Sequence, residues 1–206
     1  MALAHYFCFM FLNILNQLEQ LDRQLYIKIN SDWTNSVFDA VMPFLRNPVY
    51  WAPLYLFLLV FFTLNFKIRG LWWSLFFLCT FALTDMISSR LVKLSVMRIR
   101  PCNDPDMLGY VRLLVDCGSG FSFTSSHATN HFGLATFFFI TFRKVLPQWA
   151  WIGYAWAFSI IYAQVYVGIH YPFDVIVGAL IGIIIGIVTG NFFNNRFPLH
   201  ASMVSS

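Results

Sequence analysis

Three short polar segments interrupt an otherwise apolar chain, and the first of them carries two spaced cations. Residues 93–101 read KLSVMRIRP, in which Lys93 and Arg100 stand seven positions apart. Seven positions are about two helical turns, so both side chains face the same way if the helix persists to Pro101. An ammonium and a guanidinium on one face can hold a dianion such as a phosphoryl group. Arg98, between them, is expected to snorkel to lipid head groups.

The second polar segment, residues 121–132, reads FSFTSSHATNHF and gathers hydroxyls and two histidines at the start of an apolar run. One of the hydroxyls at positions 124–126 can cap a helix whose first turn contains His127. Free backbone N–H groups and the positive end of the helix dipole favour a phosphate at that point. Capping accounts for one hydroxyl and leaves a second hydroxyl and His127 for another role.

The third polar segment, residues 167–175, reads VGIHYPFDV. Pro172 suits a first helical turn, which puts His170 just outside the helix and Asp174 inside its first turn. A carboxylate there can accept a hydrogen bond from one imidazole nitrogen and leave the other free to attack or bind. A histidine beside an aspartate is often only a hydrogen-bonded pair, but three polar segments together favour a functional site.

The composition indicates that membrane helices must position these segments. Hydrophobic residues make up 59% of the 206 residues and charged residues 11%, which is too apolar for the surface of a soluble domain. The formal charge of +4 forms no basic stripe with interleaved aromatic residues, which argues against a nucleic acid partner. Five stretches are long and apolar enough to cross a bilayer: residues 48–66, 70–92, 122–141, 148–166 and 172–190. The sequence predicts an all-α, polytopic membrane helix bundle of five transmembrane helices, or six if the N-terminal segment crosses.

The chain divides into three parts by composition. Residues 1–47 are expected to form an apolar and amphipathic interfacial segment, residues 48–192 the transmembrane core, and residues 193–206 a cytoplasmic tail. In the last apolar stretch a glycine recurs every four residues, which predicts a smooth stripe for close helix packing. These glycines are Gly178, Gly182, Gly186 and Gly190.

Basic residues between the apolar stretches predict the orientation. They lie between the first two stretches, between the third and fourth, and after the fifth, so they share one side, which the positive-inside rule makes cytoplasmic. The three polar segments then share the extracytoplasmic side. The basic residues are Lys67, Arg69, Arg143, Lys144 and Arg196.

The four cysteines fall into two kinds. Cys102 and Cys117 bracket the extracytoplasmic loop, where an oxidising compartment would let them form a disulfide. Zinc binding is the weaker alternative, because neither belongs to a CxxC pair. Cys8 and Cys79 lie in apolar runs and are expected to be buried thiols.

In order and spacing, the three polar segments resemble the signature of the type 2 phosphatidic acid phosphatase family, which includes lipid phosphatases, glucose-6-phosphatases and vanadium haloperoxidases. The first part, K-x6-R-P, is complete in residues 93–101. The second, P-S-G-H, reads TSSH at residues 124–127. The third, S-R-x5-H-x3-D, reads AQ-x5-H-x3-D at residues 163–174. The resemblance covers about residues 48–192.

The resemblance implies how a phosphate would be bound. Lys93 and Arg100 would hold the phosphoryl oxygens, and Ser125 with the backbone N–H groups around Ser126 would complete the cradle. Gln164 stands where the family has a phosphate-binding arginine. Loss of that charged donor would cost about 2–4 kcal/mol of transition-state stabilisation unless another group replaces it.

Two replacements are open. Arg98 or Arg112 could supply the charge, or Gln164 could donate a neutral hydrogen bond.

The resemblance also implies the chemistry: His170 would attack phosphorus to give a phosphohistidine, and Asp174 would fix its tautomer. His127 would protonate the leaving oxygen, and water would then release phosphate. This route requires neither a metal nor another cofactor.

The implied function is an integral membrane phosphatase acting on a lipid phosphate or diphosphate at the outer leaflet, in the bacterial inner membrane with its site facing the periplasm. Membrane lipids surround it, and its substrate would be an isoprenyl diphosphate, a lipid A phosphate, phosphatidylglycerophosphate or phosphatidate. One alternative is a metal-dependent hydrolase that uses His127, His131, His170 and Asp174. Another is a catalytically impaired protein that binds lipid phosphates, motivated by Gln164.

Two further polar residues receive structural interpretations. His131 lies one turn after His127 and is expected to be a packed, hydrogen-bonded histidine. Asp85 is a carboxylate within an apolar stretch and is expected to form a hydrogen bond with a neighbouring helix.

Overall fold

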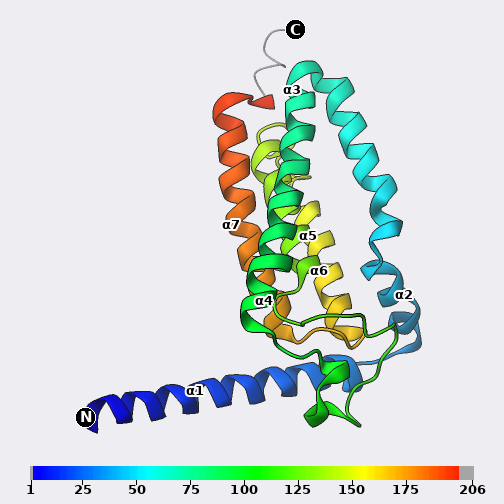
Figure 1. Cartoon of the computed structure of the whole chain (residues 1–206). Coiled ribbons are helices and arrows are strands. Elements are labelled where there is room, and N and C mark those ends of the chain that lie inside the picture. The colour runs from blue at the N-terminus through cyan, green and yellow to red at the C-terminus, as the bar shows by residue number, and fades with distance from the viewer. Residues whose placement is uncertain (1, 200–206) are drawn as a thin grey trace.

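The computed structural model describes residues 2–199, which are helical and contain no strand. The side chains of residues 2–5, 7 and 8 lie outside this description, so the expectation for Cys8 lies outside it as well. The main helices are α1 Ala2–Ile27, α2 Ser36–Arg46, α3 Ala52–Met86, α4 Lys93–Val96, α5 Ser126–Phe142, α6 Ile152–Tyr166 and α7 Pro172–Arg196 (Figure 1). Short π or 3₁₀ turns are η1 Lys28–Asp32, η2 Pro48–Trp51, η3 Ile87–Val92, η4 Pro101–Asn103 and η5 Pro105–Met107.

Helix α3 is a hairpin of two helical halves. The chain reverses at Lys67, whose φ of 53° and ψ of −129° are not helical, and the halves run side by side in Figure 1. Gly70 makes the reversal feasible, because a Cβ there would lie 1.8 Å from the Phe62 carbonyl oxygen. The two halves of α3, with α5, α6 and α7, correspond to the five predicted membrane stretches. The predicted all-α membrane bundle is confirmed.

Two parts of the described chain pass a length-and-composition test for membrane crossing, Pro48–Met107 and Pro172–Arg196. The first contains both halves of α3, and the second is α7. Cys79 lies on the exposed outer surface of α3, so the expectation that it is buried within the protein is wrong. A thiol in an apolar run can face lipid as readily as a protein core, because hydropathy does not distinguish the two.

The glycine stripe of α7 packs against α5, and these two helices form the most extensive contact in the bundle. A Cβ on Gly182 would lie 2.3 Å from the Thr129 carbonyl oxygen, and one on Gly186 would lie 2.6 Å from the Gly133 carbonyl oxygen. The predicted packing role is confirmed. Because both helices begin at the same end of the bundle, this contact also brings their first turns together (Figure 1).

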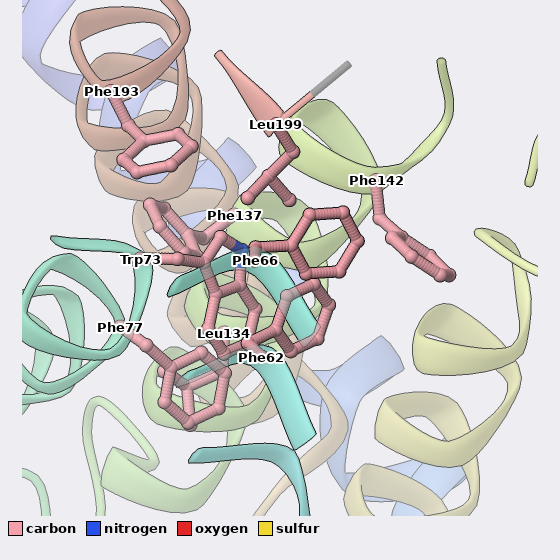
Figure 2. Close-up of a cluster of buried hydrophobic side chains, with 9 residues drawn as sticks. All are labelled: Phe62, Phe66, Trp73, Phe77, Leu134, Phe137, Phe142, Phe193 and Leu199. Carbon is pink, nitrogen blue, oxygen red and sulfur yellow. The ribbon is translucent and has the colours of Figure 1, made fainter. Parts of the chain in front are cut away.

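An aromatic cluster holds the opposite end of the bundle (Figure 2). The rings of Phe62 and Trp73 stack with centroids 3.7 Å apart across the α3 hairpin. The Trp73 indole Nε1 donates to Thr141 Oγ1 at 2.8 Å, which ties the hairpin to α5. The buried members are Phe62, Phe66, Trp73, Phe77, Leu134, Phe137, Phe142, Phe193 and Leu199.

Helix α1 lies across the end of the bundle at which α5 and α7 begin, and its N-terminal part projects away from it (Figure 1). It is attached by buried polar contacts near its C-terminus. The Tyr26 hydroxyl donates to the Gly168 carbonyl at 3.2 Å, and just beyond the helix Asn30 Nδ2 donates to the Tyr166 carbonyl at 2.7 Å. The N-terminal segment therefore packs on the loop that carries His170.

Candidate active site

The three polar segments meet at the α1 end of the bundle. Ser125 is the N-cap of α5, so α5 begins immediately before His127. Helix α7 begins at Pro172, with His170 just outside it and Asp174 in its first turn, as the sequence predicted. The Ser125 N–H donates to the Asp174 carbonyl at 3.1 Å, which joins the two helix starts directly.

His170 presents its two ring nitrogens to different groups. Nδ1 lies 3.6 Å from Asp174 Oδ2 and 3.4 Å from Ser122 Oγ, while Nε2 lies 3.5 Å from Arg100 Nη1. His170 is 2% exposed and Asp174 is 0% exposed. Nδ1 is thus directed at the carboxylate, and Nε2 is directed at a cation that can hold an anion.

Asp174 is held by several donors. The Ser122 hydroxyl and the Tyr171 backbone N–H both donate to Oδ2, the latter at 2.9 Å. Ser122 is a member of this group that the sequence analysis did not identify. It belongs to the same polar segment as His127, but no family motif marks it.

Arg98 forms the other contact of Asp174. Its Nη1 lies 2.9 Å from Asp174 Oδ1 and 2.7 Å from Asp22 Oδ2, and its guanidinium lies over the Tyr171 ring. The prediction that Arg98 snorkels to lipid head groups is therefore wrong. Two fully buried carboxylates require a positive partner, and this requirement outweighs solvation of the guanidinium at the interface.

Arg100 reaches His170 from an extended segment. Helix α4 ends at Val96, and Met97 adopts a left-handed conformation with φ 51°. The two-turn helix from Lys93 to Arg100 that the spacing suggested is therefore not formed. Arg100 is instead anchored by backbone carbonyls, with Nε donating to Gly120 at 3.2 Å.

Lys93 still belongs to this neighbourhood. It opens α4, and it is close enough to Arg100 and Asp174 to interact with both charges. Its ammonium group forms no hydrogen bond or ion pair with a described residue, so it is available to an anion.

The hydroxyls at the start of α5 are engaged within the protein. Ser125 Oγ accepts from the Ala128 N–H at 3.4 Å as the N-cap, and Ser126 Oγ lies 3.1 Å from Ser89 Oγ. The predicted cap is therefore Ser125. The sequence predicts a phosphate at the other N–H groups of this first turn.

His131 and Asp85 match their structural interpretations. His131 Nδ1 lies 2.7 Å from the His127 carbonyl oxygen, and Nε2 lies 3.1 Å from the Tyr55 hydroxyl. Asp85 Oδ1 accepts from Asn130 Nδ2 at 3.2 Å. Both His131 nitrogens are thus engaged, and residues 2–199 contain no group of three side chains of the His, Cys, Asp or Glu type arranged to share a metal ion. The geometry lends no support to the proposed metal ligand set.

Cys102 and Cys117 form a disulfide with a Cα–Cα distance of 5.9 Å. It closes the loop between Arg100 and the 119–122 segment, whose backbone carbonyls anchor Arg100. The pairing therefore constrains the segments on both sides of the candidate site.

Gln164 is fully buried, and neither Oε1 nor Nε2 has a hydrogen-bond partner within the described part of the chain. The two arginines suggested as replacements for its charge are already paired. Arg98 is bound to Asp22 and Asp174, and Arg112 Nη2 lies 2.8 Å from Asp39 Oδ1.

The electrostatic setting favours a neutral His170. Burial lowers the pKa of His170 to about 4, with the charges of Arg100 and Lys93 acting in the same direction and Asp174 opposing them. At neutral pH the ring therefore carries one proton, and the other nitrogen keeps its lone pair.

Comparison with known proteins shows the family to which the chain belongs. The family model of the PAP2 superfamily matches residues 73–198. Lipid A 4'-phosphatase of Bacteroides thetaiotaomicron is 34% identical over 167 residues, which cover 79% of this chain and 72% of that protein. Lipid A 4'-phosphatase of Porphyromonas gingivalis is 34% identical over 96 residues, 46% of this chain and 39% of that protein.

Solved structures show the same fold. A transmembrane PAP2-type phosphatidylglycerolphosphate phosphatase from Bacillus subtilis superposes with a TM-score of 0.71 at 21% identity, covering 91% of this chain and 94% of that chain. Aquifex aeolicus LpxE superposes with a TM-score of 0.60 at 27% identity, covering 82% and 94%.

Bundle, site and relatives together define an integral membrane hydrolase of phosphoric esters, of the lipid phosphatase type. The chain belongs to the PAP2 superfamily, which confirms the resemblance noted in its polar segments.

Proposed function

We propose that this phosphatase removes a phosphate group from lipid A at the extracytoplasmic leaflet. The observation that carries the chemistry is the divided environment of His170, with Asp174 at Nδ1 and Arg100 at Nε2. The choice of lipid A among the lipid phosphates is supported by the 34% identity to a lipid A 4'-phosphatase over 79% of the chain.

The reaction proceeds through a phosphohistidine. The lone pair of His170 Nε2 forms a bond to phosphorus while the bond from phosphorus to the lipid oxygen breaks, and His127 gives its proton to that oxygen. Asp174 stabilises the positive charge that develops on the His170 ring. Water then attacks phosphorus and passes a proton to His127, while the bond from phosphorus to His170 Nε2 breaks. Inorganic phosphate leaves, and both histidines are restored.

The phosphoryl oxygens are held by Lys93, Arg100 and the first-turn N–H groups of α5. These groups supply charge and orientation, which phosphoryl transfer mainly requires. Ser125 and Ser126 hold the shape of the cradle through their contacts with Ala128 and Ser89.

The site faces the periplasm from the bacterial inner membrane. The cationic loops at Lys67, Arg69 and 143–144 belong to the opposite end of the bundle, where the positive-inside rule puts the cytoplasm. A disulfide beside the site suits an oxidising compartment. In this arrangement residues 1–47 are the interfacial segment, residues 48–192 the phosphatase core and residues 193–206 the cytoplasmic tail.

Phosphate release by the detergent-purified protein tests the proposal. The substrates are lipid A, phosphatidylglycerophosphate, phosphatidate and an isoprenyl diphosphate, each assayed with EDTA. We expect release from lipid A by the wild type, and none above background by His170→Ala, because the nucleophile is lost. Chelator-sensitive release would restore the metal-dependent alternative, and lipid A binding without turnover would favour the impaired binding protein. Preferred release from another lipid would contradict the substrate assignment.

A further inference from the structure

The candidate site lacks the cation that the family has at position 164, and neither Arg98 nor Arg112 is free to replace it. We propose that Arg46, at the C-terminal end of α2, supplies this cation and binds the phosphoryl group of the substrate. This inference rests on the proposed function and adds a phosphate-binding residue from outside the family motifs.

The first observation is a shared cavity. A cavity of about 580 Å³ lies where the end of α2 meets the extracytoplasmic loop, and both Arg46 and His127 line it. Its other walls come from the α2–α3 junction and from Val115. A lipid phosphate whose leaving oxygen meets His127 therefore enters a space that Arg46 also faces.

The second observation is that the Arg46 side chain is unsatisfied. Its Nε is buried and has no hydrogen-bond partner, and its guanidinium forms no ion pair with any described residue. Arg46 is half-buried, and a buried Nε–H without an acceptor is costly. A phosphoryl group offers oxygens in the geometry that a guanidinium binds best.

The third observation is the neighbouring charge. Burial, reinforced by the charge of Arg100, lowers the pKa of Arg46. Arg100 in turn donates only to neutral groups, namely backbone carbonyls and His170. Two guanidinium groups thus repel one another across the site with no carboxylate paired to either, and a bound dianion would relieve this repulsion.

A purely structural reading is that Arg46 only stabilises the C-terminus of α2, where a cation interacts favourably with the helix dipole. The two readings differ in one respect. If Arg46 only stabilises the helix, its removal leaves the affinity for phosphate unchanged. If Arg46 binds the phosphoryl group, its removal weakens phosphate binding.

The experiment compares Arg46→Gln and Arg46→Lys with wild type, and uses Arg112→Gln as the matched control, since Arg112 is paired with Asp39 outside the cavity. Steady-state hydrolysis gives kcat/KM, and inorganic phosphate serves as a competitive inhibitor. For Arg46→Gln we expect kcat/KM to fall about 100-fold and the phosphate inhibition constant to rise about tenfold. Arg46→Lys should recover part of both, and Arg112→Gln should stay within about threefold of wild type.

Unchanged phosphate inhibition in Arg46→Gln, with or without a lower melting temperature, would overturn the inference and leave a structural arginine. The proposed function is judged separately, by the wild type and His170→Ala. If the wild type hydrolyses no lipid tested, the role of Arg46 is tested by phosphate binding instead. The rise in melting temperature caused by inorganic phosphate is then compared between wild type and Arg46→Gln. A rise that is equal in wild type and Arg46→Gln would then refute it.

Discussion

At the scale of single residues, the site is organised around the asymmetry of His170. Asp174 and Ser122 lie beside Nδ1, and Arg100 lies beside Nε2, so only Nε2 is directed at an anion-binding group. Asp174 is fixed by Arg98 and by two hydrogen-bond donors before any substrate arrives. Such an arrangement needs little reorganisation during the reaction.

The low pKa of His170 predicts the acid limb of the pH profile. In the proposed mechanism the neutral ring is the nucleophile, so activity is expected above the pKa and is lost as pH falls through it. Because burial lowers this pKa to about 4, kcat/KM should remain near its plateau at pH 5.5, where a histidine of ordinary pKa about 6.5 would be mostly protonated. Rates are measured from pH 3.5 to 8 and corrected for ionisation of the lipid phosphate, titrated separately. An acid limb near pH 6.5 would contradict the prediction.

At the scale of elements, the contact between α5 and α7 sets the distance between the segments that carry the two proposed catalytic histidines. His127 lies in the first turn of α5, and His170 immediately precedes α7. The glycines of α7 allow backbone atoms of the two helices to approach closely. Small residues are effective here because lipid provides no hydrophobic force to press helices together.

Gly182 is the position at which this contact is most easily broken. A Cβ there would lie 2.3 Å from the Thr129 carbonyl oxygen, so Gly182→Val must push α5 away from α7. We expect a loss of about 1–3 kcal/mol in the free energy of unfolding, together with a larger than tenfold loss of activity. The melting temperature in detergent measures the loss of stability, and phosphate release in detergent measures the loss of activity. Ile184→Ala is the control, since Ile184 is 61% exposed on the outer face of the same helix, and an equal effect of the two changes would argue against the packing account.

At the scale of the whole molecule, ion pairs connect the N-terminal segment to the helix bundle. Asp22 on α1 is 0% exposed, pairs with Arg98, and accepts from the Phe173 N–H at 2.8 Å. Arg98 then holds Asp174, the partner of His170. A helix that is remote from the family motifs is therefore connected to Asp174, the proposed catalytic carboxylate, by two ion pairs.

Asp22→Asn tests this connection. It removes one of the two carboxylates that share Arg98 while preserving the size of the side chain. We expect kcat to fall by about tenfold, because the position of Asp174 is less well defined, while the inhibition constant of inorganic phosphate stays within about twofold. An equal change in both quantities would indicate a general loss of structure. Glu19→Gln, on an exposed pair of the same helix, is the matched control.

The sequence by itself determined the features that arise within one segment. Apolar stretches of membrane length identified the helices of the bundle, Pro172 marked the start of α7, and the His170–Asp174 spacing set that pair. Only the tertiary structure decided which distant side chains surround the site. Arg98 turns inward to Asp22, 76 positions away, and Arg46 lines the cavity of His127 from another helix. The periodicity of apolar residues indicates which face of a helix is apolar, because it depends only on neighbouring residues. The partner of a buried charge depends on how elements that are far apart in the chain pack together.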